Sequence, residues 1–209
     1  MSVRYGVELV PEPAFVAWAH RTRKLICDQY GSWTAEMFMI HLTVADFFQC
    51  PDPAVEAIAA ALATLAAQSR QRIPQFPLSH NGVATFPNVI GTIFLDFQQP
   101  ERPQPLHTLH HSVIDLLGQT PGVIPDLRHS GEKYWPHLTL MQAANLPPSV
   151  FEDAKEFARA VVEDSSPPAS TKAWKLILVR FQSNAAGDSW DEGRWAADLR
   201  WNVLASYSL

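Results

Sequence analysis

Apolar positions in the first part of the chain follow two spacings, one typical of strands and one typical of helices. Residues 3–10 alternate loosely and residues 37–48 form an apolar and aromatic run, so both segments are predicted to be strands. Between them, apolar residues recur at steps of three and four, which is the spacing of one helix face. This face consists of Phe15, Trp18, Ala19, Thr22, Leu25 and Ile26.

The middle of the chain predicts a second helix and two short strands. Asp52 followed by Pro53 is typical of a helix start, with Asp52 as the N-cap residue. The apolar face of this helix consists of Val55, Ile58, Ala59, Leu62, Leu65 and Ala66. Residues 75–79 and 88–97 then predict strands, with an Asn-Gly turn between them.

The second half repeats this order of elements. A helix is predicted to end at Gly118, because glycine readily adopts the left-handed conformation that closes a helix. The predicted helices cover residues 106–117 and 149–163, and the predicted strands cover residues 137–143, 173–181 and 195–204. Because the order strand, helix, strand, helix occurs twice, the chain is interpreted as a diverged internal duplication.

Composition narrows the class of protein. The 209 residues are 47% hydrophobic and 18% charged, as in a folded soluble protein. The formal net charge of −5 argues against a groove for long duplex nucleic acid. Two cysteines cannot build a disulfide framework, and no apolar run is long enough to span a bilayer. We therefore expect a cytoplasmic protein that does not enter a membrane.

The candidate chemistry is carried by a repeated tripeptide. His41-Leu42-Thr43 and His137-Leu138-Thr139 each lie in a predicted apolar strand at the same place in their half. Residues two apart in a strand point to the same face, so each tripeptide presents an imidazole beside a hydroxyl. His20 and His110 also fit the pattern His-x-Thr/Ser, but they fall in predicted helices, where the two side chains diverge.

Two such pairs facing each other across a cleft suit phosphate-ester cleavage. One histidine takes a proton from the attacking hydroxyl or water, and the other protonates the leaving oxygen. The hydroxyls hold the non-bridging phosphate oxygens. Histidine is suited to both tasks because its unperturbed pKa lies near 6.5.

On these motifs the sequence resembles the two-histidine (2H) phosphoesterases, and within them the bacterial RNA 2′,3′-cyclic phosphodiesterases, also called 2′-5′ RNA ligases or LigT-like proteins. The resemblance covers nearly the whole chain. It extends to the segment Phe76-Pro77-Leu78, to the helix ending at Gly118, and to Tyr134-Trp135-Pro136 before the second tripeptide. It departs from the family after each signature, where Asp46-Phe47-Phe48 and Met141-Gln142 stand.

The resemblance implies an α+β fold of two pseudo-symmetric lobes, each an antiparallel sheet with helices on its outer side, around a central cleft. We expect one domain over residues 1–209, with one lobe of about residues 1–87 plus part of the C-terminal strands and the other of residues 88–209. The implied activity is metal-independent hydrolysis of 2′,3′-cyclic phosphates to 2′-phosphates, with no cofactor. Reversible 2′-5′ RNA ligation is a further activity that the resemblance implies, and the direction, ligase or hydrolase, stays open. Substrate size stays open, since superfamily members also act on small cyclic phosphates of nucleotides and ADP-ribose. The implied partner is a small cyclic-phosphate nucleotide or an RNA 3′ end, bound by a monomer.

Carried over by position, His41 and His137 form the acid and base pair, and Thr43 and Thr139 bind phosphate. Three further residues are candidates from their own context. Arg180 could reach the phosphate, or could face outward on its strand. Tyr134 and Trp135 could stack on a base, or could be core residues.

Two other readings of the chemistry are open. His107 and His111 are four apart on a predicted helix, a spacing that can hold one metal ion, but no third ligand is evident. A binding module could use the same cleft for a nucleotide or RNA end without turnover. Cys27 and Cys50 have no neighbouring base in the sequence, which argues against a cysteine nucleophile.

Overall fold

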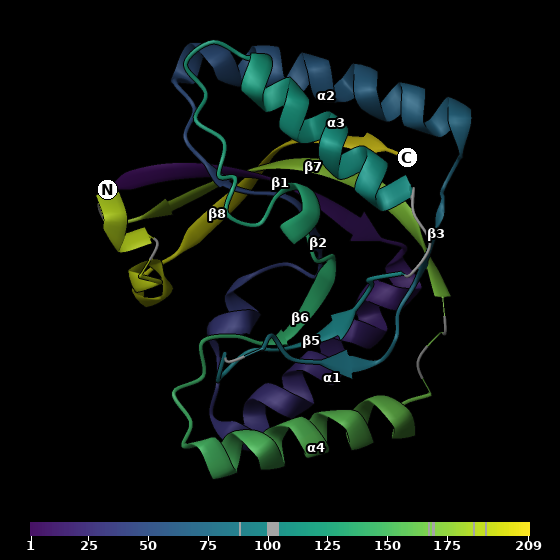
Figure 1. Cartoon of the computed structure of the whole chain (residues 1–209), viewed down its shortest axis with the longest axis vertical. Helices are drawn as coiled ribbons and strands as arrows, with labels where there is room; N and C mark the ends of the chain where they lie inside the picture. Colours follow the sequence, from purple (N-terminus) through teal and green to yellow (C-terminus); the bar gives the residue numbers. More distant parts are fainter. Residues whose placement is uncertain (88, 100–104, 167, 169, 186, 191) are drawn as a thin grey trace.

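Two antiparallel sheets form the middle of the molecule, and helices cover the outer side of each (Figure 1). The computed structural model describes residues 1–87, 89–99, 105–166, 168, 170–185, 187–190 and 192–209. The fold is therefore of the α+β class, as expected. No described helix is both long enough and apolar enough to cross a membrane.

The larger sheet has the order β2-β1-β7-β3, and β8 also pairs with β7. Its strands are β1 (Ser2–Pro11), β2 (Leu42–Phe48), β3 (Pro77–Ser79), β7 (Ser170–Ser183) and β8 (Arg200–Ser208). Successive side chains on β1 alternate between its two faces. Tyr5, Val7 and Leu9 belong to the main core, whereas Glu8 pairs in register with Ile177, which belongs to a second, smaller core cluster.

The smaller sheet has the order β4-β5-β6. Its strands are β4 (Val83–Ala84), β5 (Ile93–Asp96) and β6 (His137–Met141). Two helices lie below it in Figure 1, α1 (Pro13–Tyr30) and α4 (Pro148–Asp164). Helix α1 contacts both β6 and α4, so the smaller sheet and these two helices form one layered unit.

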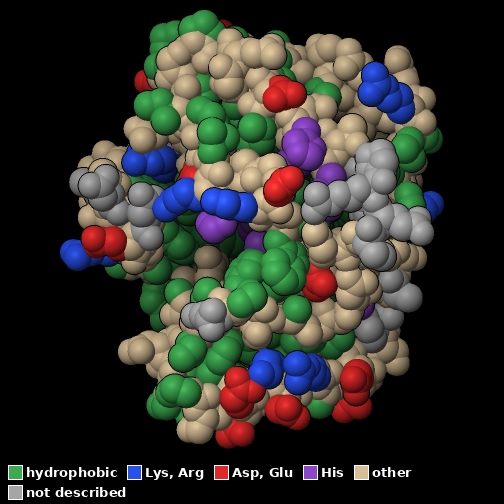
Figure 2. All heavy atoms as spheres, viewed as in Figure 1, with side chains coloured by type: hydrophobic (Ala, Val, Ile, Leu, Met, Phe, Trp, Pro, Cys, Tyr) green, Lys and Arg blue, Asp and Glu red, His purple; other side chains and the backbone are tan. Residues whose placement is uncertain are grey.

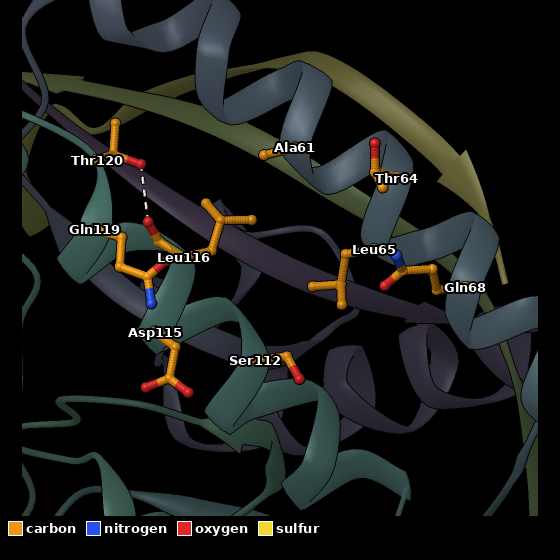
Figure 3. A pocket seen from close by; sticks show the side chains of 9 residues that line it. All are labelled: Ala61, Thr64, Leu65, Gln68, Ser112, Asp115, Leu116, Gln119 and Thr120. Atoms are coloured by element: carbon orange, nitrogen blue, oxygen red, sulfur yellow. Dashed lines mark hydrogen bonds between the residues drawn. The ribbon is translucent and has the colours of Figure 1, made fainter.

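The other two helices, α2 (Asp52–Arg72) and α3 (Pro105–Gln119), lie side by side over the larger sheet (Figure 1). One face of α2 is buried, formed by Ala54, Ile58, Leu62 and Ala66. Figure 3 shows a groove between the two helices, lined in part by Leu65, Leu116 and Asp115. This groove contains no histidine and lies on the helix side of the sheet, away from both His-Leu-Thr tripeptides.

Short 3-10 helices complete the elements: η1 (Thr34–Met37), η2 (Gly131–Lys133), η3 (Gly187–Trp190) and η4 (Arg194–Ala197). Two of them, η1 and η4, overlap the starts of two predicted strands. The expected strand over residues 37–48 begins only at Leu42, and the expected strand over 195–204 begins only at Arg200. Main-chain carbonyls before Leu42 accept hydrogen bonds from the side chain of Arg23, which makes them unavailable to a sheet.

Two helix-cap predictions are wrong, and the short strands β3 and β5 belong to different sheets. The N-cap of α2 is Pro51, so Asp52 lies in the first turn. Gly118 lies inside α3 and does not adopt a positive φ. The strand predicted over 75–79 is β3, but it pairs with β7, and the partner of β5 is β4. Residue 88, where the strand before Asp96 was expected to begin, lies outside the described residues.

Helices from each half of the sequence pack on strands from the other half. Helix α1 follows β1 in the chain but packs on β6 of the smaller sheet, whereas α3 contacts β2 of the larger sheet. Strands β7 and β8, from the end of the chain, complete the larger sheet beside β1. The packing therefore crosses the expected boundary at residue 87. Neither half of the sequence contains both a sheet and all of the helices that cover it.

Candidate active site

The two His-Leu-Thr tripeptides lie at the contact between the two sheets. His137 is the first residue of β6, and His41 immediately precedes β2. Strands β2 and β6 belong to different sheets but contact each other. In each tripeptide the leucine is fully buried and the histidine and threonine are partly exposed, so the histidine and threonine share the burial pattern of one strand face.

The two imidazoles have matching hydrogen bonds. Nδ1 of His41 lies 2.8 Å from the carbonyl oxygen of Met39, and Nδ1 of His137 lies 2.7 Å from that of Trp135. A carbonyl oxygen only accepts hydrogen bonds, so Nδ1 carries the hydrogen in both rings. The remaining nitrogen, Nε2, is then free to exchange a proton with a ligand.

Burial keeps both rings neutral. It lowers the pKa of His41 to about 4, opposed by the hydrogen bond to Met39 and reinforced by the charges of Arg23 and His137. Burial also lowers the pKa of His137, opposed by the hydrogen bond to Trp135 and by nearby carboxylates, which include Asp46. Because a charge on His137 lowers the pKa of His41, the two rings interact electrostatically across the contact between the sheets.

A buried carboxyl group, which the sequence did not predict at the site, lies beside His41. Oε2 of Glu8 is 3.6 Å from Nε2 of His41, and only 4% of the Glu8 side chain is exposed. Burial and the charge of Asp46 raise the pKa of Glu8 well above its usual value, whereas a hydrogen bond with Thr43 lowers it. The available sequence signal is the position of Glu8 as an acidic residue near the end of an otherwise largely apolar predicted strand.

Each tripeptide is held by a side chain from the other part of the sequence. Arg23 of α1 donates hydrogen bonds of 3.0 Å and 2.8 Å to the main-chain carbonyl of Thr139. It donates two more, each 2.9 Å, to the carbonyls of Ala35 and Phe38, just before His41. Arg23 is buried, and burial lowers the pKa of its guanidinium to about 10.

The reciprocal contact comes from Tyr134. Its hydroxyl donates a 2.9 Å hydrogen bond to the main-chain carbonyl of Thr43. The ring stacks on His110 of α3, with centroids 3.8 Å apart, and burial raises the Tyr134 pKa. Tyr134 is only 5% exposed. Of the two alternatives that the sequence left open, a core position and a stacking surface for a base, the structure places Tyr134 in the core.

Trp135 and Arg180 have different surroundings. Trp135 is partly exposed, and its indole donates a 2.8 Å hydrogen bond to Asp96, opposite His137 in the sheet. Arg180 pairs in register with Tyr5, on the face of β7 that includes Leu178 and lies under the helices. The structure therefore does not bring Arg180 to the histidines, because strand alternation places it on the opposite face from Ile177 and Val179.

Aromatic rings flank both histidines. His137 lies 5.1 Å from the ring of Phe86 and 5.0 Å from that of Phe94, and both of these rings contact Trp135. His41 lies 6.1 Å from Phe38, which belongs to a cluster with Phe47, Phe181, Trp190 and Trp195. Figure 2 shows histidine side chains within a hollow near the middle of this face, with Lys or Arg above and apolar side chains below.

The remaining histidine and cysteine candidates lie elsewhere. His107 is buried against Tyr134 and His111 is exposed. Within the part of the chain that is described, no group of three or more His, Cys, Asp or Glu side chains could hold a metal ion. Burial raises the pKa of the Cys27 thiol to about 12 and also raises that of Cys50, so neither is a ready nucleophile.

Comparison with known proteins gives the chain its family. The sequence profile of the 2′-5′ RNA ligase superfamily matches residues 11–185. A solved structure described as a phosphoesterase is 15% identical, with a TM-score of 0.54 over 100% of this chain and 99% of that one. Escherichia coli LigT complexed with 3′-AMP is 17% identical, with a TM-score of 0.52 over 99% and 97% of the two chains. The same LigT complexed with NADP+ is 14% identical, with a TM-score of 0.54 over 99% and 96%.

At these identities the solved structures show a shared fold, and the profile shows the family. No curated protein sequence matches the chain. The profile match spans both His-Leu-Thr tripeptides, and the two histidines of these tripeptides interact electrostatically. The chain therefore belongs to the 2′-5′ RNA ligase superfamily of two-histidine phosphoesterases.

Proposed function

We propose that this protein is a cyclic phosphodiesterase that hydrolyses 2′,3′-cyclic phosphates of nucleotides or RNA ends to 2′-phosphates without a metal ion. The observation that carries the proposal is the matched hydrogen bonding of the two imidazoles. Both donate Nδ1–H to the carbonyl two residues earlier, which leaves both Nε2 atoms for proton transfer. Membership of a phosphoesterase family, and the 3′-AMP complex of E. coli LigT, support this chemistry.

The proposed reaction needs two proton transfers. One imidazole takes a proton from water as the water oxygen attacks phosphorus, and the bond from phosphorus to the 3′ oxygen breaks. The other imidazole gives a proton to that leaving oxygen. The hydroxyls of Thr43 and Thr139 hold the non-bridging oxygens, where negative charge grows in the transition state.

The surroundings of the site favour a small substrate. Aromatic side chains flank both histidines, and rings of this kind stack on a nucleobase. Asp46 adds a carboxylate near His137, and the net charge is −5. Repulsion of a long polyanion therefore favours mononucleotides and short RNA ends, with Trp135 as the candidate stacking residue.

The test is turnover of 2′,3′-cyclic nucleotides in the presence of EDTA. His41→Ala and His137→Ala should each lower kcat by about 10²- to 10⁴-fold, because each removes one proton transfer. His20→Ala is the matched control, since His20 carries the same His-x-Thr pattern but is exposed on α1. No turnover by the unmodified protein, or full activity of either variant, would contradict the proposal.

A second candidate function is binding without turnover. It is favoured by the lowered pKa of both histidines, because an acid and base pair needs one charged ring. In that case a cyclic nucleotide would bind at equilibrium, with no 2′-phosphate formed over hours. Calorimetric binding combined with product analysis separates the two functions.

We also infer that the two layers of the fold arose by duplication and enclose the substrate between them. The matching hydrogen bonds of His41 and His137 support this inference. Formation of a 2′-5′ bond uses the same groups, with the 5′-hydroxyl of a second RNA in place of water as the group that attacks phosphorus. Incubating the protein with an RNA that ends in a 2′,3′-cyclic phosphate and one with a free 5′-hydroxyl tests it.

A further inference from the structure

The proposed reaction requires a proton donor that neither histidine supplies alone at neutral pH. Burial lowers the pKa of His41 to about 4 and also lowers that of His137. With Nδ1–H donated to a carbonyl, each neutral ring can accept a proton at Nε2 but has none to give there. This inference rests on the proposed function and concerns the source of the missing proton.

The side chain of Glu8 is positioned to hold that proton. Its Oε2 lies 3.6 Å from Nε2 of His41. Gly6, two residues earlier on the same face of β1, makes room for the carboxyl group, since a Cβ atom there would lie 2.6 Å from Oε1 of Glu8. The same Cβ atom would lie 3.0 Å from the Phe181 ring, so the space at Gly6 is bounded by both side chains.

Hydrogen bonding indicates where a proton on Glu8 would point. The Thr43 hydroxyl is hydrogen-bonded to the carboxyl group, and Oε2 is buried with no hydrogen-bond partner among the described residues. An unpaired buried carboxyl oxygen is costly unless it is protonated and directed at an acceptor. The acceptor in front of it is Nε2 of His41, at a separation that closes to a hydrogen bond with a small movement.

We propose that Glu8 stores the proton for the leaving group and passes it through His41, so that His41 is the general acid and His137 the general base. Glu8 thus acts through His41 as a positioning residue. At the start, Glu8 is a carboxylic acid and both rings are neutral. As the phosphorus–oxygen bond breaks, the Glu8 proton moves to Nε2 of His41, and from there to the leaving oxygen.

The proton balance closes without another reactant. The attacking water loses one proton to His137, and the leaving oxygen gains one from His41. Glu8 ends as a carboxylate and His137 as an imidazolium. Transfer of one proton from His137 to Glu8 through solvent restores the starting state. Coupled groups of this kind titrate as a pair and not as separate residues.

The other charged groups near this pair agree with the assignment. Asp46 raises the pKa of Glu8, and so keeps its proton in place. Arg23 and His137 both disfavour a lasting charge on His41. Tyr134 interacts electrostatically with Glu8 and stays neutral, because burial raises its pKa.

The residue opposite Glu8 in the sheet and the surroundings of His137 are also consistent with this assignment of acid and base. The β7 residue opposite Glu8 is Ile177, which is apolar. His137 has no carboxylate within 4 Å in the described part of the chain, so the base lacks the partner that the acid has.

The decisive variant is Glu8→Gln, which keeps the size of the side chain but cannot carry an acidic proton. With 2′,3′-cyclic nucleotides, kcat should fall by about 10²- to 10⁴-fold with KM little changed. The residual activity should rise as the pH falls toward the His41 pKa of about 4. Glu12→Gln is the matched control, because Glu12 is hydrogen-bonded to Thr171 at the far end of β1.

A second substrate separates proton donation from structure. In a 4-nitrophenyl phosphodiester of a nucleotide, the leaving group is 4-nitrophenolate, a stable anion that needs no proton. The Glu8→Gln variant should therefore cleave this substrate at close to the rate of the unmodified protein. Equal loss on both substrates, or a Glu8→Gln pH profile identical to that of the unmodified protein, would overturn the inference. Failure of the unmodified protein on both substrates would contradict the proposed function instead.

A measurement on the unmodified protein covers the case in which Glu8→Gln fails to fold. Carbon NMR of the glutamate carboxyl groups should show one group that remains protonated at neutral pH, next to His41 in its Nδ1–H form. A Glu8 signal that titrates like an exposed glutamate, near pH 4, would overturn the inference.

Discussion

Burial of His41 makes the stability of the protein depend on pH. In the folded state its pKa is about 4, compared with an ordinary value of 6.5. Between these values the unfolded chain binds more protons, so stability rises with pH from 4 to 6.5 and is lost as pH falls. The full effect of such a shift is about 3 kcal/mol. In urea unfolding from pH 4 to 7, the unmodified protein should gain stability relative to His41→Asn as the pH rises; a constant difference between the two proteins would contradict the prediction.

Glu8 has the opposite effect on stability. Its pKa is raised in the folded state, so the folded protein keeps a proton that the unfolded chain loses. Stability should therefore fall as pH rises above the usual glutamate range toward the raised pKa. The same unfolding series with Glu8→Gln should remove this fall, while Glu12→Gln should keep it. A decline of equal size in both variants would show that the decline does not come from Glu8.

At the scale of elements, one side chain connects α1, η1 and β6. Arg23 donates to the carbonyls of Ala35, Phe38 and Thr139, and its removal leaves these buried carbonyls without a partner. We expect Arg23→Met to cost about 2–4 kcal/mol of unfolding free energy, and to reduce kcat through displacement of both tripeptides. Arg21→Met, an exposed position on the same helix, is the control and should change stability little. Equal unfolding midpoints for the two variants would contradict this role.

Tyr134 connects the second part of the sequence to β2. Tyr134→Phe removes only the hydroxyl that donates to the Thr43 carbonyl, so the cost should be about 1 kcal/mol. Because that carbonyl belongs to a residue proposed to bind phosphate, KM for a cyclic nucleotide should rise more than kcat falls. An unfolding curve and a kinetic series on the same variant check both effects.

At the scale of the whole molecule, the two halves of the sequence depend on each other. Helix α1 packs on β6, and β7 pairs with β1, so a chain cut at residue 87 exposes the apolar face of both parts. Neither residues 1–87 nor residues 88–209 should fold alone, as judged by circular dichroism and hydrogen exchange. Mixed together, the two fragments should regain structure. Cooperative unfolding of either fragment by itself would contradict this prediction.

The sequence by itself determined the family resemblance of the two tripeptides and most of the helices and strands. Local spacing suffices for these features, because a helix face and a strand face repeat every few residues. It also distinguished the strand-borne histidines from His20 and His110, which lie in α1 and α3. The boundaries before Leu42 and Arg200 were missed, because contacts with distant residues set them.

Only the tertiary structure decided which residues surround the two histidines. Glu8, Arg23 and Tyr134 reach them from segments far apart in the sequence, through strand pairing and helix packing that no local pattern contains. The position of Arg23 next to Thr22 and Ile26 on the apolar face of its helix was one sequence signal of such a role. Leu25, expected on that face, is exposed instead. Burial, which sets the pKa of Glu8 and His41, depends on the whole fold and not on the identity of neighbours in the chain.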